Sequence, residues 1–246
     1  MSDATANDDD PHDGWAARIA AFDRPPAAKP PRKAPITVDR IVDTALAIIE
    51  AEGFDALTMR RVAVDLETGP ASLYAHVHNK AELDDLVIGR LCRHVELPTP
   101  DAAGWQEQMM HVCRQLRDQF LRYPGVSRAA LAAAPNSVDT MRINEGMLAI
   151  LLAAGVPPRS AAWTIDAAYL YVSAYCLESS LRREPGTAAD ARALTTQQLV
   201  ARLRMLPADR FPNTVAHAQE LASGEGHERF DFTLGVLFRG VAEPSD

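Results

Sequence analysis

From residue 38 onwards the chain has a pattern of apolar and polar residues that is typical of an amphipathic helix. The apolar residues recur at intervals of about three and four, and they are Val38, Ile41, Val42, Ala45, Leu46, Ile48 and Ile49. Thr37 is a favourable N-cap, and Gly53 is typical of a helix end. The pattern therefore predicts a first helix between Thr37 and Gly53.

Two short helices are predicted next, separated by a turn. The first follows the N-cap residue Thr58, and its apolar positions are Met59, Val62, Ala63 and Leu66. The segment 67–69 (Glu-Thr-Gly) forms the turn, and Pro70 suits the first position of a helix, where its missing N–H has no intrahelical acceptor. We expect this third helix to reach about Val77.

Asn79 followed by Glu82 resembles a capping box and predicts a fourth helix that ends near His94, before Pro98 and Pro100. Proline and glycine then divide the rest of the chain into helical segments. These are expected near residues 104–123, 126–133, 137–154, 159–183, 195–205, 212–222 and 226–242. No stretch alternates as a strand does, so the sequence predicts an all-α fold.

Composition narrows the classes of protein that fit this pattern. The hydrophobic fraction of 47% supports a packed core, and the net charge of −8 argues against a protein that coats nucleic acid unspecifically. The three cysteines form no C-x-x-C pair, so we expect no disulfide framework, metal site or cofactor. The chain starts without a secretory signal pattern, and the apolar stretch 161–177 contains Asp166 and is short for a membrane span. We expect a cytoplasmic protein.

Residues 1–35 are acidic at the start and rich in proline afterwards, which predicts a disordered tail. Two interpretations of this tail stay open. It is either a plain flexible segment or an arm whose Lys29, Arg32 and Lys33 contact DNA phosphates or a minor groove.

The second and third helices, about residues 58–77, have the form of a helix-turn-helix. Leu73 and Val77 suffice to dock the third helix, which leaves small or hydrogen-bonding residues on its outer face. A recognition helix requires that division between a narrow apolar side and a polar side. Arg60 and Arg61 oppose the helix dipole at the start of the second helix, and a nearby phosphate would reverse that effect.

The segments Leu57–Ala63 and Ser72–Leu83 resemble the DNA-binding domain of the TetR (tetracycline repressor) family, and the similarity extends over residues 36–96. The resemblance implies that Thr58 and Arg60 contact phosphate or a base. It places Pro70, Ala71 and Ser72 at base edges and thymine methyl groups. It also implies that the DNA backbone is contacted by Tyr74, His76 and Lys80.

This chain departs from the family pattern at several positions. Glu67 and Thr68 stand where the family usually has glycine and a small apolar residue. Pro70 and Ala71 offer no side-chain hydrogen bond to a base, so base readout there depends on methyl contacts and DNA shape. Glu96 occupies the position of a histidine in the family's tetracycline–magnesium site, so the resemblance does not extend to tetracycline as the ligand.

The resemblance also implies that residues 97–246 form a larger helical domain that binds a small molecule and dimerises. The helices near 159–183 and 226–242 are the candidates for the dimer interface, through apolar stripes formed by Ala167, Leu170, Tyr171, Ala174 and Leu177, and by Phe230, Leu234, Leu237 and Phe238. An alternative is that these stripes belong to the core of one subunit. Candidate ligand-pocket residues, which also suit a plain core, are Met110, Cys113, Leu116, Phe120, Met147, Leu151, Trp163 and Tyr169.

Two other classes of protein, an enzyme and a protein–protein adaptor, are the alternatives to a transcriptional regulator. The sequence contains no phosphate-binding loop, nucleophile elbow or H-E-x-x-H motif, so no enzymatic activity is expected. A helical protein–protein adaptor without DNA binding stays the alternative, because acidic residues outnumber basic ones even within 36–96. The favoured hypothesis is a homodimeric repressor that a small molecule releases from a palindromic DNA operator.

Overall fold

The computed structural model describes residues 35–132, 137–183, 194–224 and 226–242. Every regular element in these residues is helical, which agrees with the predicted fold class. The predicted disordered tail, with Lys29, Arg32 and Lys33, lies outside the described residues except for Pro35.

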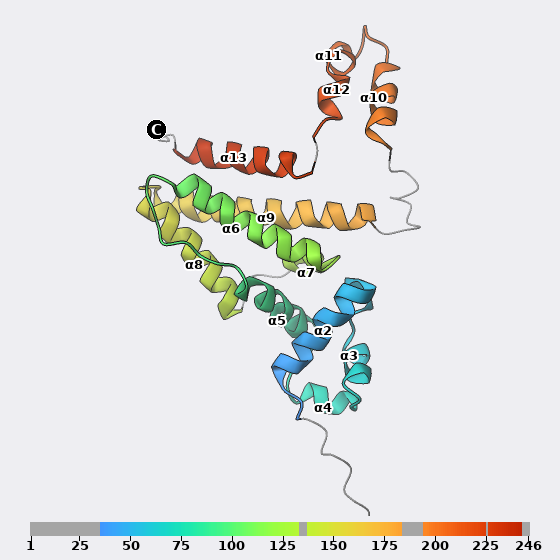
Figure 1. The fold of residues 1–246 in the computed structure, drawn as a ribbon, viewed down its shortest axis with the longest axis vertical. Coiled ribbons are helices and arrows are strands. Elements are labelled where there is room, and N and C mark those ends of the chain that lie inside the picture. Colours follow the sequence, from blue (N-terminus) through green and yellow to red (C-terminus); the bar gives the residue numbers. More distant parts are fainter. Residues whose placement is uncertain (1–34, 133–136, 184–193, 225, 243–246) are drawn as a thin grey trace, which may run out of the picture. The chain divides into compact units, whose positions relative to one another are not determined.

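The first group of helices contains the predicted helix-turn-helix (Figure 1). Its elements are α2 (Val38–Glu52), the short 3-10 helix η1 (Phe54–Ala56), α3 (Met59–Asp65), α4 (Pro70–Tyr74) and α5 (Lys80–Arg93). Helix α2 packs against α3 and α5, and α3 packs against α4. The short α4 thus packs on α3, which in turn packs on α2.

The second group is arranged around α9 (Pro158–Arg183), which contacts four other helices. These neighbours are α6 (Trp105–Arg122), α7 (Val126–Ala132), α8 (Val138–Ala153) and α13 (Glu228–Ala242). Three short helices connect α9 with α13 and pack against one another, namely α10 (Thr196–Arg204), α11 (Pro212–Ala216) and α12 (Ala218–Leu221). Buried side chains of both groups form one continuous hydrophobic core.

The predicted N-caps are confirmed. The Thr37 hydroxyl accepts from the Arg40 backbone N–H at 3.2 Å, and the Thr58 hydroxyl accepts from that of Arg61 at 3.0 Å. Asn79 accepts from the N–H of Glu82 at 2.9 Å. The second half of the predicted capping box is wrong, because the Glu82 carboxylate accepts from the His78 N–H at 2.6 Å rather than from Asn79.

Three predicted helix boundaries are also wrong. Helix α4 ends at Tyr74 rather than near Val77, because the chain must leave the helix before the extended cap residue Asn79. The helix expected over 212–222 is broken at His217, whose φ of −109° and ψ of 27° are not helical. Helix α13 begins after the left-handed Gly226, at φ +53°, rather than at it.

All three cysteines are buried and unpaired. Burial raises the pKa of Cys92 to about 11 and those of Cys113 and Cys176 to about 12. Because the thiolate is the reactive form, we expect no thiol of the native protein to react with Ellman's reagent at pH 8 on the time scale in which glutathione reacts. After unfolding in guanidinium, three thiols per chain should react. Rapid labelling of the native protein would contradict this expectation.

Candidate nucleic-acid interface

The turn between α3 and α4 closes through a Schellman motif. The Thr68 N–H donates to the Ala63 carbonyl at 2.9 Å, and the Glu67 N–H donates to the Val64 carbonyl at 2.9 Å. This motif requires a left-handed residue, and Glu67 has a φ of +50°, the one positive value at a non-glycine residue in the described parts of the chain. The conformation costs about 1–2 kcal/mol for a residue with a side chain, which is a physical reason to prefer glycine at this position.

Helix α4 is held to the rest of the unit by two side chains. Leu73 and Val77 are both fully buried, and the backbone N–H of Val77 donates to the Leu73 carbonyl at 3.0 Å. The other side chains from Pro70 to His76 are exposed, and Tyr74 keeps 49% of its surface accessible. The helix therefore presents an outer face that packing does not require.

The two arginines at the start of α3 have different surroundings. Arg61 forms ion pairs with Asp65 and, at 2.7 Å, with Glu52 at the end of α2, and these hydrogen bonds raise its pKa. Arg60 and the cap residue Thr58 are exposed. Arg61 is thus held within the protein, and Arg60 is the arginine of this pair that is presented to solvent.

Lys80, the first residue of α5, is held in place from two sides. Its ammonium group lies 4.2 Å from the centre of the Phe54 ring and forms an ion pair with Asp84. Burial raises the pKa of Asp84, and the pairing with Lys80 opposes that effect. Together with Thr58, Arg60, Pro70, Ala71, Ser72, Tyr74 and His76, Lys80 makes up what we call the candidate DNA-binding surface.

The C-terminal half of α5 is fixed to α2 and to α8 by arginines. Arg90 forms ion pairs with Asp39 and Asp43 on α2, and Arg93 pairs with Asp139 on α8 at 3.0 Å. In addition, Arg142 of α8 donates to the carbonyl of Cys92, in the last turn of α5, and to that of Val95, just beyond the helix, each at 2.8 Å. Helical periodicity and capping patterns do not reveal these contacts, because the partners of Arg90, Arg93 and Arg142 lie about fifty residues away along the chain.

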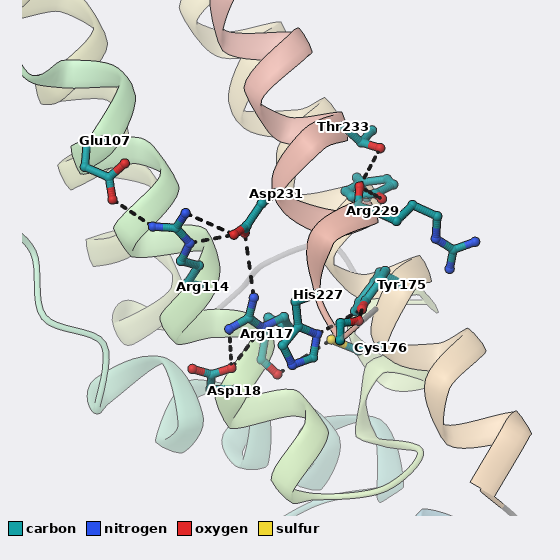
Figure 2. Close-up of polar contacts among 12 residues, drawn as sticks. Glu107, Arg114, Arg117, Asp118, Tyr175, Cys176, His227, Arg229, Asp231 and Thr233 are labelled. Atoms are coloured by element: carbon teal, nitrogen blue, oxygen red, sulfur yellow. Dashed lines mark hydrogen bonds and ion pairs between the residues drawn. The ribbon is translucent and has the colours of Figure 1, made fainter. Parts of the chain in front are cut away.

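A second polar network attaches α13 to α6 and α9 (Figure 2). Arg114 donates twice to Asp231, at 3.1 Å in each case, and also pairs with Glu107 at 2.7 Å. Arg117, which is only 7% exposed, lies 4.9 Å from the centre of the Phe230 ring and pairs with Asp118 at 2.8 Å. These contacts fix which face of α13 is turned inward.

The tyrosines of α9 complete this contact. Tyr175 is hydrogen-bonded to His227 Nδ1 at 2.9 Å, and Tyr171 donates to the Arg229 carbonyl at 3.2 Å. The Tyr175 ring meets Phe230 edge to face, with centroids 5.0 Å apart. The start of α13 is therefore anchored on α9 by both polar and aromatic contacts.

The candidate pocket residues lie in two environments. Seven of them are buried or half-buried on α6, α8 and α9, and these are Met110, Cys113, Leu116, Phe120, Met147, Leu151 and Tyr169. Trp163 is separate from them, because 68% of its surface is exposed. A cavity of about 590 Å³ lies elsewhere, between α8 and α9, and is lined by different residues, among them Met141, Arg142 and Leu148.

The helices expected to form a dimer interface carry a second, outward apolar face. On α13 the predicted stripe residues Phe230, Leu234 and Phe238 are buried within the chain. Exposed apolar residues lie on the other side of that helix and on α9, and we call this set the outer apolar face: Trp163, Leu170, Phe232 and Val236.

The described residues contain no helix that is long and apolar enough to cross a membrane. They also contain no cluster of three or more histidine, cysteine or acidic side chains suited to a metal ion.

A short exposed helix docked behind a tight turn, joined to a larger helical domain, defines a transcriptional regulator of the helix-turn-helix class. Residues 41–84 match the family described as bacterial regulatory proteins, tetR family, and residues 97–244 match the tetracyclin repressor-like C-terminal domain. The chain belongs to the TetR family.

Known proteins are similar to it over most of their length. The structure of the Streptomyces coelicolor protein ActR in complex with actinorhodin is 40% identical, covers 85% of this chain and 96% of that one, and has a TM-score of 0.76. Tetracycline repressor protein class D of Escherichia coli is 30% identical over 82% of this chain and 87% of that protein. BioQ, solved with its natural double-stranded DNA operator, is 25% identical over 84% and 98%, with a TM-score of 0.60.

These findings decide between the classes of protein considered above. The chain is a ligand-responsive, DNA-binding repressor of the TetR family, and proteins of this family are regulators rather than enzymes. The alternative of a protein–protein adaptor without DNA binding is therefore set aside.

Proposed function

We propose that the protein binds a palindromic operator as a homodimer and leaves it when a small molecule binds. In this proposal residues 36–96 form the DNA-binding domain and residues 97–246 the regulatory and dimerisation domain. One α4 enters each of two successive major grooves, about 34–36 Å apart. Since its proposed target is operator DNA, we place the protein in the cytoplasm.

The exposed face of α4 carries this proposal. Pro70, Ala71 and Ser72 meet base edges and thymine methyl groups, while Tyr74 and His76 contact the DNA backbone. At the start of α3, Thr58 and Arg60 contact phosphate or a base, and Lys80 contacts a phosphate. Arg61 is left out of the proposed contacts, because its guanidinium group pairs with two carboxylates, those of Glu52 and Asp65.

The dimer is proposed from the outer apolar face. Trp163 and Leu170 on α9 and Phe232 and Val236 on α13 remain exposed in the single chain, between 48% and 69% each. Large apolar side chains left exposed on two helices that pack together favour association. Phe230 and Asp231 on the inner side of α13 contact Arg117 of α6, which leaves the outer side of α13 to a partner.

The effector is proposed to be an organic small molecule, like the actinorhodin with which the similar protein ActR forms a complex. The mostly buried candidate pocket residues on α6, α8 and α9 stay a prediction for its binding site. Glu96, which stands at the position of the family histidine, is exposed, and the Gln115 side chain is hydrogen-bonded to both its backbone N–H and its carbonyl. Among the residues that the structure describes, Glu96 belongs to no cluster suited to a metal ion.

The test is selection of genomic DNA fragments by the purified protein and by the Tyr74→Ala, Lys80→Ala double variant. We expect the unaltered protein to enrich one palindromic motif and the variant to lose it, because both a backbone contact and a phosphate charge are removed. Arg202→Ala is the matched control, since it removes one positive charge from the exposed surface of α10. Circular dichroism confirms that each variant is folded.

Either of two outcomes would contradict the proposal. One is that the unaltered protein enriches no motif at low salt, where phosphate contacts are strongest. The other is that the double variant enriches the same motif as strongly as Arg202→Ala does, which would mean that α4 and Lys80 do not read DNA.

A further inference from the structure

The cavity between α8 and α9, which we call the α8–α9 groove, has the properties of a small-molecule site. Its volume of about 590 Å³ lies within the range of known ligand pockets, about 300–1,000 Å³. The walls are mainly apolar, with Met141, Leu148 and Ile165 among the lining residues. Arg142 is the one cation that lines it, and Glu145 is the one acid.

Arg142, a residue of α8, also contacts the end of α5. Its Nη2 atom donates to the carbonyl oxygens of Cys92 and Val95, each at 2.8 Å, and lies 3.4 Å from that of Arg93. The last carbonyls of a helix lack the usual donor four residues on and carry the negative end of its dipole. The Cys92 carbonyl also accepts from the Val95 N–H at 3.1 Å, so Arg142 adds a charged donor to this helix end. One guanidinium group therefore both lines the groove and caps the helix whose first residue is Lys80.

The contact between α5 and α8 is close enough to transmit a displacement. A Cβ atom added at Gly89 would lie 2.7 Å from the Ser137 hydroxyl oxygen, so the two helices meet there without a side chain between them. Arg93 and Asp139 pair at 3.0 Å across the same contact. Because α5 and the start of α8 are in direct contact, we expect a displacement of the N-terminal half of α8 to be passed on to α5.

We propose that the α8–α9 groove, in place of the buried residues predicted from the sequence, binds the effector and that the effector is an apolar molecule with one anionic oxygen. This inference rests on the proposed function. The anionic oxygen binds the half-buried Arg142, and the apolar body contacts Met141, Leu148 and Ile165. Glu145 is exposed at the same site and disfavours a second negative charge.

The proposed binding removes Arg142 from the carbonyls of Cys92 and Val95. A guanidinium group prefers an anionic oxygen to a neutral carbonyl, because charge-assisted hydrogen bonds between ions are the stronger ones. The end of α5 then loses its cap and moves relative to α8, and Lys80 and α4 move with it. Effector and operator therefore bind antagonistically, and the coupling acts equally in both directions.

The probe for the test is 8-anilinonaphthalene-1-sulfonate, which is an apolar fluorescent molecule with a single anionic group. We expect a saturable site on the unaltered protein and a decrease of operator affinity of about 5- to 150-fold at saturation. Arg142→Gln removes the charge, and Ala162→Trp fills the groove from an exposed lining position. Both variants should lose the site and the coupling.

Arg93→Gln is the matched control, because it removes an arginine from the same helix contact without altering the groove. It should keep the probe site. Arg142→Gln should also bind operator about tenfold or more weakly without the probe, since the end of α5 is uncapped. Thermal unfolding separates this effect from a loss of folded protein, and Ala162→Trp should keep operator affinity without the probe.

The outcomes distinguish this inference from the proposed function. If operator binding is normal but the probe does not bind, or binds equally to Arg142→Gln and Ala162→Trp, the groove is not the effector site and the inference is wrong. If the probe binds through Arg142 without changing operator affinity, the proposed coupling between the groove and operator binding does not exist. If no variant, including the unaltered protein, binds any operator, the proposed function itself fails.

Discussion

Leu73→Ala is expected to destabilise the protein by about 2–5 kcal/mol and to abolish operator binding. Leu73 is fully buried, and together with Val77 it holds α4 against the rest of the domain. A helix as short as α4 is not stable in isolation, because it has too few internal hydrogen bonds to offset its nucleation. Losing the leucine contact therefore disorders the DNA-reading helix as well as the core.

Urea unfolding and an operator-binding assay under the same conditions measure the two effects. Val64→Ala is the control, since Val64 lies on the adjacent α3 but is 62% exposed, and its loss should change stability by no more than about 0.5 kcal/mol. Operator binding by Leu73→Ala at the affinity of Val64→Ala would show that α4 does not need this contact.

Two phenylalanines on α13 are expected to affect different properties, Phe230 the stability of the single chain and Phe232 the association of two chains. Phe230 is fully buried against Arg117 and Tyr175, so Phe230→Ala should lower the free energy of unfolding by about 3–5 kcal/mol. Phe232 is 69% exposed and belongs to the outer apolar face, so Phe232→Ala should leave the fold of the single chain nearly unchanged.

The effect of Phe232→Ala should appear in association. Burial of one such ring contributes about 1.5–3 kcal/mol, and a symmetric dimer buries two, so the dimer dissociation constant should rise about 100-fold or more. Sedimentation over a range of concentrations measures this constant, and unfolding of dilute protein measures stability. A dimer that is unaffected by Phe232→Ala would place the interface elsewhere.

The local part of the fold could be predicted from the sequence. Thr37, Thr58 and Asn79 are N-caps in the structure because their side chains act on backbone groups only three residues away. The helix-turn-helix was predictable for the same reason, since the turn and the docking residues Leu73 and Val77 follow one another closely along the chain.

Interactions between distant parts of the chain could not be predicted in this way. Arg142 caps a helix that ends nearly fifty residues earlier, and Arg114 pairs with Asp231 across more than a hundred. Helical periodicity also does not say which of two apolar faces is buried. Phe230 and Phe232 have the same side chain and lie two residues apart, yet only the packing of α13 on α9 and α6 decides which one is exposed.

At Glu67 the chain departs from the family pattern and also has a left-handed backbone conformation. The resemblance marked the position as unusual, and the left-handed backbone there supplies the physical reason. The Schellman hydrogen bonds of Glu67 and Thr68 keep the turn despite the side chain.

On α4, the residues that stabilise the fold and the residues that face solvent are different ones, and this separation affects how such a protein acquires new DNA targets during evolution. Stability depends on the inward Leu73, while exposed positions such as Ser72 and Tyr74 contribute little to the fold. Mutations on the outer face can therefore accumulate in a duplicated gene without unfolding its product. The protein encoded by the duplicated gene can therefore come to recognise a different operator while it keeps the same fold. A few substitutions are then enough to change which genes are regulated.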